Sequence, residues 1–395
     1  MEKTPAGMCK HIGIFGDTNA GKSTLMNGLL GEEVSIVSSQ RGTTTDPVRA
    51  SMELLPHGPV VLIDTAGTRD PGKLAQKRLQ KTNAVVHRCD VALHLTDARD
   101  ALERGLDDFE SSGTVIRLLT KSDLLSETQR GDIQRRFLDA LLVDVTAAQD
   151  IERIKKRLLT ALQQSGEEKP SPLIADRLPA GADVVLVVPI DSEAPAGRLI
   201  LPQVQLIREL LDFQMNVHVC RESELTRMLA VCTKVDLVVT DSQAFGVVDA
   251  LLPRDIPLTS FSVLLARQKG DLLQQIRGAT ALDALNEGDR VLILEACKHS
   301  AGHEDIGRVK IPALLRKKAG GKAIEFDFRT GYDMPDDLSA YAAAILCGSC
   351  MISKAEVGHR LRLFEDLDLP VSNYGLVIAH CHGILARATE IFQRG

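Results

Sequence analysis

The stretch Gly16-Asp17-Thr18-Asn19-Ala20-Gly21-Lys22-Ser23-Thr24 determines the fold of the first part of this chain. It matches the pattern G-x-x-x-x-G-K-[ST], whose glycines let the backbone wrap a triphosphate and turn its N–H groups inward. In such a loop Lys22 neutralises the terminal phosphates, and the Ser23 hydroxyl can ligate Mg²⁺. Residues 11–15 suit a buried strand and residues 22–30 a helix, so the helix N-terminus would face the phosphates. An ordinary glycine-rich turn would need neither flank, so the stretch predicts a nucleotide-binding α/β domain.

A polar, proline-terminated loop at residues 40–47 follows the first helix. A threonine of this loop can join the Mg²⁺ shell when the γ-phosphate is bound, with Thr44 the first choice and Thr43 or Thr45 the alternatives. A loop of this kind standing alone would be taken for a solvated turn rich in hydroxyls.

The loop does not stand alone, because a buried strand predicted at residues 60–63 ends in Asp64-Thr65-Ala66-Gly67. The carboxylate of Asp64 can hold the Mg²⁺ hydration shell, and the N–H of Gly67 can bond the γ-phosphate. The two segments together predict a magnesium site beside the triphosphate loop.

A guanine-reading segment is predicted at Thr120-Lys121-Ser122-Asp123, after strands at residues 90–96 and 114–119. The Asp123 carboxylate can accept from N1–H and the exocyclic amine of guanine, a donor pair that adenine lacks, so it selects GTP over ATP. The stem of Lys121 can pack over the base. A last strand is predicted at residues 143–147, with its end near the base.

These four elements, each at the end of a strand, resemble the translation-factor-like GTPases, with the Era and tRNA-modifying GTPases as the closest subgroup. The resemblance covers about the first 150 residues. It implies Lys22, Thr44 and Gly67 as catalytic residues. The nucleotide would be held by Gly16, Asn19, Ala20, Gly21, Lys22, Ser23, Thr24, Asp64, Gly67, Thr120, Lys121 and Asp123, and Mg²⁺ by Ser23, Thr44 and Asp64.

Three positions bear on how the site would work. Thr120 stands where the family usually has Asn, which implies weaker base binding, and Thr68 replaces a water-positioning Gln, which implies slow hydrolysis. Asn19 occupies the place of a potassium ligand in potassium-activated members, so K⁺ is expected to act as the missing positive charge. Plain loop capping is the alternative for Asn19.

Composition restricts the class of protein. A chain of 395 residues predicts two or three domains, and 25% charged with 44% hydrophobic residues is typical of soluble globular proteins. A net charge of −6 argues against nucleic acid as a partner, and no apolar run is long enough for a membrane span. Eight cysteines without a secretory signal indicate reduced thiols or metal ligands and a cytoplasmic location.

A polar, proline-containing linker at residues 165–172 is followed by a second alternation of strands and helices. Thr233-Lys234-Val235-Asp236 looks like another guanine motif, but no second phosphate loop precedes it, so we interpret it as coincidence. Cys220 and Cys232 are expected to be small buried residues. Without a catalytic constellation, this module is expected to serve association.

Cysteines mark the last part of the chain. Cys297-Lys298-His299 follows a predicted strand, and an apolar run at residues 342–346 leads into Cys347-Gly348-Ser349-Cys350. Thiolates in this pattern favour an iron–sulfur cluster or zinc, with a redox dithiol or a packed pair as alternatives.

Three cysteines leave a 4Fe–4S cluster one ligand short. The fourth position is open among His299, His303, Glu304, Asp305, water and a partner's ligand, whereas zinc would form a closed site from Cys297, His299, Cys347 and Cys350. Helices are predicted at residues 353–367 and 375–392, and His380, Cys381 and His382 are expected to be packing or surface residues.

The order of the three parts resembles the FeFe-hydrogenase maturation GTPases, the HydF family, as do the segments 197–203 and 305–312. The resemblance implies a homodimer formed by the middle module and a 4Fe–4S cluster held by Cys297, Cys347 and Cys350, with His299 a further candidate. It also implies a scaffold that carries a diiron precursor cluster to apo FeFe-hydrogenase and works with two radical-SAM maturases. Many members have His before the C-x-x-C, and here that residue is Leu346.

The expected architecture is therefore α/β, with a P-loop GTPase domain at residues 1–168, a dimerisation domain at 169–265 and a mixed α/β iron–sulfur domain at 266–395. Two other functions fit parts of the sequence. An RNA- or ribosome-associated GTPase with a structural zinc tail is disfavoured by the acidic balance. A dithiol oxidoreductase using Cys347 and Cys350 leaves Cys297 unexplained.

Overall fold

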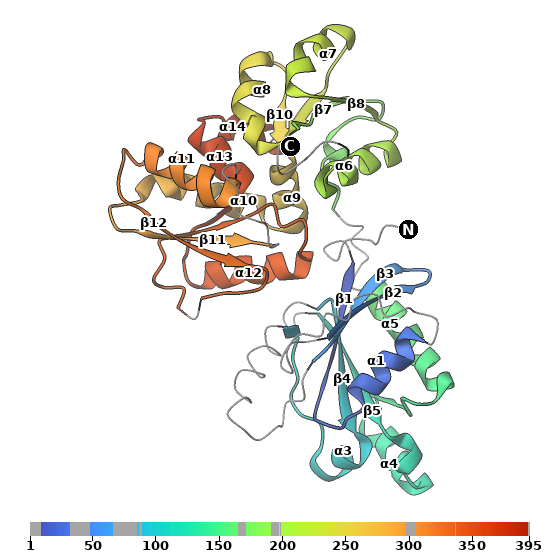
Figure 1. Cartoon of the computed structure of the whole chain (residues 1–395). Helices are drawn as coiled ribbons and strands as arrows, with labels where there is room; N and C mark the ends of the chain where they lie inside the picture. Colours follow the sequence, from blue (N-terminus) through green and yellow to red (C-terminus); the bar gives the residue numbers. More distant parts are fainter. Residues whose placement is uncertain are drawn as a thin grey trace. The chain divides into compact units, whose positions relative to one another are not determined.

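The structure is a computed structural model that describes residues 9–31, 48–65, 85–86, 89–111, 113–164, 171–190, 197, 199–296, 305–335 and 337–393. The chain divides into two compact units, Met1–Lys169 and Pro170–Gly395. One six-stranded sheet lies in the first unit and two four-stranded sheets lie in the second (Figure 1). The expectation of an α/β fold built on a P-loop domain is confirmed.

The first unit is a six-stranded sheet in the order β2-β3-β1-β4-β5-β6, in which only β2 runs antiparallel. Its parallel strands are nearly continuous apolar runs because helices cover both of their faces. The strands are β1 (Lys10–Gly16), β2 (Val48–Leu54), β3 (Gly58–Asp64), β4 (Val91–Asp97), β5 (Thr114–Thr120) and β6 (Leu141–Leu142). The helices are α1 (Lys22–Leu30), α3 (Ala98–Arg104), α4 (Glu127–Arg136) and α5 (Ala148–Gln164).

The strand predicted at residues 143–147 is wrong, because β6 ends at Leu142 and a turn follows. The side chain of Asp144 accepts hydrogen bonds from the N–H and the hydroxyl of Thr146, at 2.8 and 2.7 Å. This Asx turn competes with strand pairing, so the apolar valines on either side do not extend the sheet.

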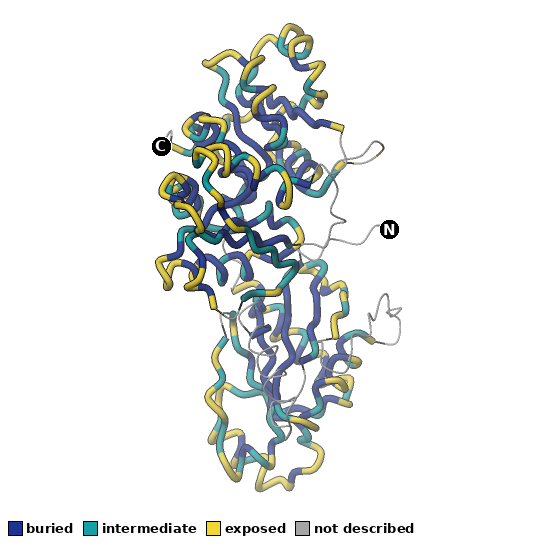
Figure 2. Tube along the Cα trace, turned by 60° about the vertical axis from the view of Figure 1, so that its left-hand side comes forward, coloured by how far each residue is buried: buried dark blue, intermediate teal, exposed yellow. Residues whose placement is uncertain are grey.

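The second unit contains two wholly parallel sheets, with strand orders β10-β9-β7-β8 and β12-β11-β13-β14. The first sheet consists of β7 (Asp183–Val187), β8 (Asn216–Cys220), β9 (Leu237–Thr240) and β10 (Leu258–Ser260). The second consists of β11 (Arg290–Glu295), β12 (Glu325–Thr330), β13 (Ala343–Leu346) and β14 (Val371–Asn373). In each sheet the two central strands are buried along most of their length (Figure 2).

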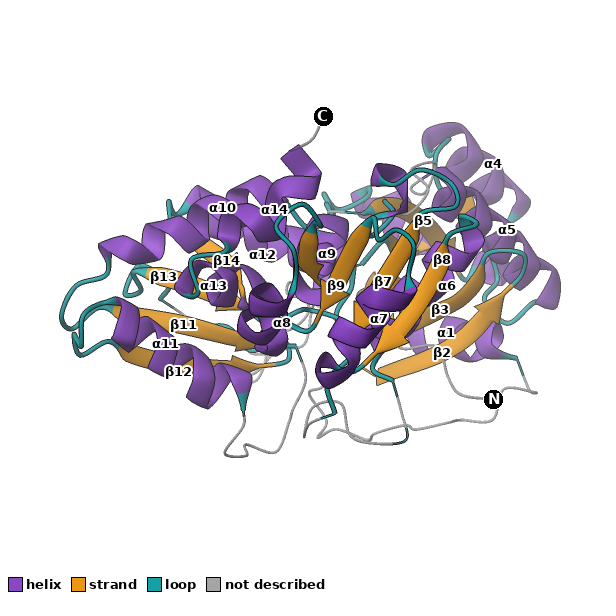
Figure 3. Cartoon of the chain, turned by 90° about the horizontal axis from the view of Figure 1, so that it is seen from above, coloured by secondary structure: helices purple, strands orange, loops and turns teal. Residues whose placement is uncertain are grey.

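Helices flank both sheets of the second unit (Figure 3). They are α6 (Leu201–Asp212), α7 (Leu225–Val231), α8 (Phe245–Leu251), α9 (Phe261–Lys269), α10 (Leu272–Ala281), α11 (Ile311–Lys318), α12 (Lys354–Asp366), α13 (Tyr374–Cys381) and α14 (Leu385–Gln393). Helix α9 contacts α6 beside the first sheet and α12 and α13 beside the second. The domain boundary expected between residues 265 and 266 lies inside this helix.

The single helix predicted at residues 375–392 is wrong, because the chain forms two helices there, α13 and α14. Gly383 has φ 74°, a left-handed conformation that ends α13. The N–H of Gly383 bonds the His380 carbonyl and that of Ile384 bonds the Ala379 carbonyl, the two hydrogen bonds of a Schellman cap.

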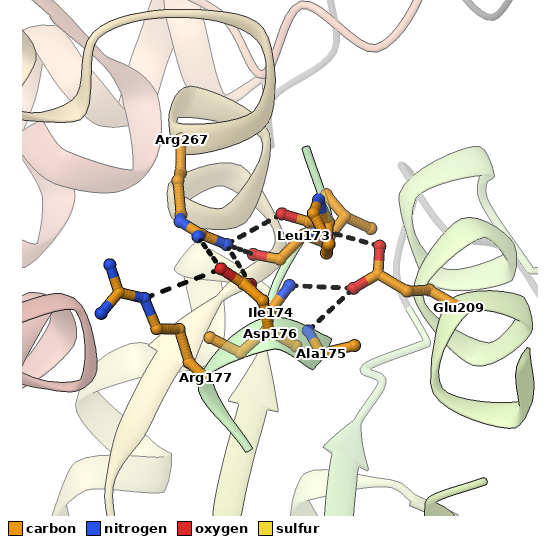
Figure 4. A network of polar contacts seen from close by, with 8 residues as sticks. Leu173, Ile174, Ala175, Asp176, Arg177, Glu209 and Arg267 are labelled. Carbon is orange, nitrogen blue, oxygen red and sulfur yellow. Dashed lines mark hydrogen bonds and ion pairs between the residues drawn. The ribbon is translucent and has the colours of Figure 1, made fainter. Parts of the chain in front are cut away.

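The segment that enters the second unit is fixed by two charged side chains (Figure 4). Glu209 of α6 accepts the N–H groups of Leu173, Ile174 and Ala175 at 2.7, 2.9 and 3.0 Å. Arg267 of α9 donates to the carbonyls of residues 172 and 173 and forms a bidentate pair with Asp176. A carboxylate and a guanidinium thus hold one short backbone segment from opposite directions.

Candidate functional site

The phosphate loop joins β1 to α1, as the sequence predicts. Gly16 has φ 139°, and a Cβ atom there would lie 2.2 Å from the Leu95 carbonyl oxygen, so only glycine fits. Gly21 has φ 94° and Asn19 has φ 65°, which places three residues of the loop in conformations that favour glycine or asparagine. Their backbone geometry turns the loop around the N-terminus of α1.

Lys22 lies over the loop and is only 8% exposed. Its ammonium group donates to the carbonyls of Gly16 and Asp17, at 3.0 and 2.7 Å. The lysine charge is therefore held at the loop, where it can face the terminal phosphates.

Ser23 and Asp64, both predicted magnesium ligands, lie side by side. The Ser23 hydroxyl donates to Asp64 Oδ2 at 2.8 Å, although the two residues are far apart in sequence. The other oxygen of Asp64, Oδ1, is buried and has no hydrogen-bond partner among the described residues. Burial raises the pKa of Asp64, because the ionised carboxylate is poorly solvated there. A cation bound at Oδ1 would stabilise the ionised form and offset that desolvation. Thr44 and Gly67 lie outside the described residues.

Thr120 connects the guanine motif to the phosphate loop. Its side chain is completely buried, and its hydroxyl donates to the Ala20 carbonyl at 2.9 Å and lies 3.3 Å from the Thr96 carbonyl. Thr24 is exposed on the first turn of α1. The threonine that departs from the family pattern therefore holds the loop in place through a hydroxyl group.

The residues predicted to read the base follow β5 directly. Lys121 has φ 59° and its ammonium lies 3.0 Å from Asp97 Oδ2, and Asp123 is exposed in the short helix at residues 122–124. Burial acts to raise the pKa of Asp97, but hydrogen bonds from Arg99 and Lys121 outweigh it and hold this pKa well below its ordinary range. Sequence reasoning missed Asp97. The signal that could have found it is its place at the carboxyl end of β4, between the strands that lead into the phosphate loop and the guanine motif.

Cys347 follows β13 and is bound at its sulfur by two backbone groups. The N–H of Ala296 lies 3.1 Å and that of Ser349 3.4 Å from Cys347 Sγ. Burial raises the pKa of the Cys347 and Cys350 thiols. Among the residues that the structure describes, no three or more His, Cys, Asp or Glu side chains form a metal-binding group. Cys297, His299, His303 and Glu304 are outside that set.

Asp305 is the one candidate for the fourth ligand that is described. It is buried, and its carboxylate accepts the N–H of Arg308 at 2.8 Å, so it caps the helical turn at residues 306–310. This role is sufficient to explain its burial.

Sequence reasoning missed three residues near Cys347, which are Glu295, Tyr374 and Lys269. Buried Glu295 lies 3.3 Å from the Arg308 guanidinium and 3.5 Å from the Tyr374 hydroxyl. Lys269 is also buried, and burial lowers its pKa to about 8, so it stays protonated at neutral pH. No motif marks these residues, because each is brought to the cysteines from a different element.

Models of three protein families match the chain in order. The model described as 50S ribosome-binding GTPase matches residues 11–121. The hydrogen maturase F dimerization domain matches residues 173–270, and the hydrogen maturase F tetramerization domain matches residues 273–391. The last two matches together cover nearly all of the second unit, and their names support oligomerization of the chain.

The curated relatives are GTPases. GTPase Der of Wolinella succinogenes is 34% identical over 193 residues, which are 44% of this chain and 40% of that protein. The tRNA modification GTPase MnmE of Chromobacterium violaceum is 30% identical over 164 residues, 40% of this chain and 36% of that protein. The chain thus spans at most 40% of the length of these curated relatives.

Among solved structures, a variant of Era from Aquifex aeolicus bound to GDP and AlF₄⁻ is 18% identical. It covers 53% of this chain and 93% of its own, with a TM-score of 0.30. Within the described parts of the chain, none of the helices combines the length and the apolar character that crossing a bilayer requires.

Proposed function

The chain belongs to the hydrogen maturase F family and carries a GTPase domain, and we propose that it is a scaffold in the maturation of FeFe-hydrogenase. In this proposal it binds a 4Fe–4S cluster, assembles a diiron subcluster and delivers it to apo FeFe-hydrogenase. Turnover of GTP would control the exchange of partners rather than the chemistry of the cluster.

The nucleotide half of the proposal assigns Mg²⁺ to Ser23, Thr44 and Asp64. The support is the Ser23–Asp64 contact together with the buried Oδ1 of Asp64, which suits a hard cation with oxygen ligands. Gly67 would bond the γ-phosphate, and Asp123 would select guanine.

The site is also proposed to use K⁺ at Asn19, which holds a left-handed conformation in the phosphate loop. Hydrolysis of GTP by the full chain should then be faster in KCl than in NaCl at equal ionic strength. Asn19→Ala should remove that difference, whereas a difference that persists in the variant, or equal wild-type rates in both salts, would reject K⁺ activation.

The cluster half of the proposal assigns the iron ligands to Cys297, Cys347 and Cys350. The observation that carries it is the contact of the Ala296 N–H with Cys347 Sγ. Ala296, which makes this contact, immediately precedes Cys297 in the sequence. Backbone N–H groups aimed at a cysteine sulfur are typical of iron–sulfur sites.

When bound, the cluster would supply an iron atom with a coordination place open to a metal fragment. The chain's part is to hold the three thiolates and to leave that place accessible. Leu346 cannot ligate, so the fourth position remains with His299, His303, Glu304, Asp305 or an exchangeable ligand.

Anaerobic reconstitution followed by EPR tests this assignment. Wild-type protein should turn brown with about four iron atoms per chain, and Cys297→Ser, Cys347→Ser and Cys350→Ser should each lose or change the spectrum. Cys232→Ser, at the C-cap of helix α7, serves as the control and should keep it. Stoichiometric zinc in a colourless wild-type protein, or unchanged spectra in all three variants, would reject the cluster.

The proposed division of labour gives the GTPase to residues 1–168, homodimer formation to 169–265 and cluster binding to 266–395. Proposed partners are the two radical-SAM maturases and apo FeFe-hydrogenase. Capture of these proteins by the full chain supports the scaffold, and capture of ribosomes in their place would favour a ribosome-associated GTPase.

A further inference from the structure

The C-x-x-C turn packs on one face of helix α9, which belongs to the matched dimerization domain. A Cβ atom at Gly348 would lie 3.7 Å from both Ser262 Oγ and Leu265 Cδ1. Ser262, Leu265 and Lys269 are spaced three and four residues apart, so they share one face of the helix. The turn that carries two of the cysteines therefore rests on a helix from the preceding module.

Lys269 ends this face and is 5% exposed. Its ammonium group donates to three backbone carbonyls of the turn: Ser349 at 2.9 Å, Cys350 at 3.2 Å and Ile352 at 2.8 Å. Three acceptors match the three N–H bonds of an ammonium group. All three carbonyl groups bond the same ammonium group, so Lys269 fixes their directions. One of them belongs to Cys350, so the backbone of that cysteine is fixed as well.

The turn itself is strained at Ser349, which has φ 55°. A non-glycine residue in this conformation is strained, so it persists only where surrounding contacts hold it. The Ser349 N–H lies 3.4 Å from Cys347 Sγ, so the strained residue also orients the other cysteine. A side chain that fixes the Ser349 carbonyl thus acts on both sulfurs of the motif.

We propose that Lys269 is a positioning residue for the cluster, holding the C-x-x-C turn in its ligating shape from helix α9, which lies in the segment that the dimerization model matches. The inference rests on the proposed cluster site and goes beyond it by making iron binding depend on a residue of α9 that is far from the C-x-x-C motif in the sequence. Groups that orient a metal ligand typically change metal affinity by roughly 10- to 100-fold when removed.

Arg267 provides a matched control on the same helix. It too is a long cation that donates to backbone carbonyls, but its acceptors are at residues 172 and 173 and its ion pair is with Asp176. Residues two apart on a helix face different directions, so this side chain leaves the cysteine turn alone. The Arg267 variant therefore separates the loss of any cation that binds backbone carbonyls from the loss of Lys269 itself.

The experiment compares Lys269→Met, Lys269→Arg and Arg267→Met in the full chain after anaerobic reconstitution. Iron per chain and the EPR spectrum are measured, and hydrogen exchange of residues 347–352 is followed in metal-free protein. Lys269→Met should lower iron affinity roughly 10-fold, change the EPR spectrum and speed exchange in the turn. Arg267→Met should keep wild-type iron, spectrum and exchange of that peptide.

Lys269→Arg covers the case in which the methionine variant does not fold. Arginine keeps the charge, but a planar guanidinium cannot meet three converging carbonyls as an ammonium does, so a changed EPR spectrum is expected. Wild-type spectra and wild-type exchange in the folded Lys269 variants would overturn the inference. Failure of the wild-type chain to bind a cluster would instead reject the proposed function, and the two failures are therefore distinct.

Discussion

The hydroxyl of Thr120 donates to the carbonyl of Ala20 at 2.9 Å and so joins the end of β5 to the phosphate loop. Both groups are buried. A buried hydrogen bond contributes about 0.5–1.5 kcal/mol net, and breaking it leaves a carbonyl unsatisfied at a further cost. Thr120, which replaces the asparagine usual in the family, therefore connects the predicted guanine motif to the phosphate loop.

We predict that Thr120→Val lowers GDP affinity, because the loop loses this support while the side-chain shape is kept. The expected loss is roughly 5- to 10-fold, the equivalent of about one hydrogen bond. Titration with a fluorescent GDP analogue measures it. Thr114→Val, at the exposed start of the same strand, should bind as wild type. Equal affinity in both variants would show that the bond does not support the loop.

Magnesium binding is predicted to weaken on acidification. Burial raises the pKa of Asp64, so in metal-free protein the folded state holds this proton more tightly than the unfolded state. The cost of burying the ionised carboxylate is thus relieved as pH falls through the folded pKa, which lies above the ordinary value of about 3.9. Mg²⁺ needs the ionised form, so its affinity should fall over the same range.

Mg²⁺ titrations of GTP hydrolysis at several pH values check this prediction. Asp64→Asn should cut hydrolysis by roughly 100-fold and remove the pH dependence of the Mg²⁺ requirement. Asp100→Asn, on helix α3 and with a side chain that is 46% exposed, provides the control. A variant at Asp64 with wild-type Mg²⁺ dependence would exclude this carboxylate from the site.

Glu209→Gln is predicted to loosen the segment that enters the second unit. The carboxylate accepts three backbone N–H groups, and a neutral amide with one oxygen cannot replace it. Amide exchange at residues 173–175 should rise by roughly 10-fold, which corresponds to about 1.4 kcal/mol. Mass-spectrometric hydrogen exchange of that peptide measures the change.

Asp212→Asn is the matched control for this helix, because it removes an exposed ion pair with Arg208 on α6. Surface pairs of this kind contribute little, so exchange at residues 173–175 should stay as in the wild type. Equal exchange in the Glu209 and Asp212 variants would mean that the entering segment is held by other contacts.

Gly278→Ala is predicted to destabilise the second unit, because a Cβ atom there would lie 1.9 Å from the Val371 carbonyl oxygen. Helix α10 would have to move away from β14, at a cost of about 1–3 kcal/mol. All three tyrosines are at residues 332, 341 and 374 and there is no tryptophan, so tyrosine fluorescence during urea unfolding reports on this unit alone.

Gly358→Ala tests whether the destabilisation by Gly278→Ala comes from steric overlap of the added Cβ atom. Its Cβ would lie 3.4 Å from the flexible end of Arg362, so the change should be neutral or stabilise by about 0.4–1 kcal/mol. A Gly278 variant as stable as the Gly358 variant would show that α10 moves without cost.

The sequence by itself determined the features that depend on neighbouring residues. The strand, loop and helix around Lys22 were predictable because apolar runs, glycines and a phosphate-binding pattern act over a few positions. The pair Cys347 and Cys350 was likewise visible as a motif after an apolar strand. The same local reasoning failed at Asp144 and Gly383, where a side-chain turn and a left-handed residue overrode the apolar pattern.

Only the tertiary structure decided which distant residues meet. Thr120 reaches Ala20, Ser23 reaches Asp64, and Ala296 reaches Cys347, because parallel strands bring their carboxyl ends to one edge of a sheet. Lys269 reaches the cysteine turn because α9 packs between two sheets that belong to different matched domains. Strand order and helix packing set these contacts, and neither can be predicted from the spacing of residues along the chain.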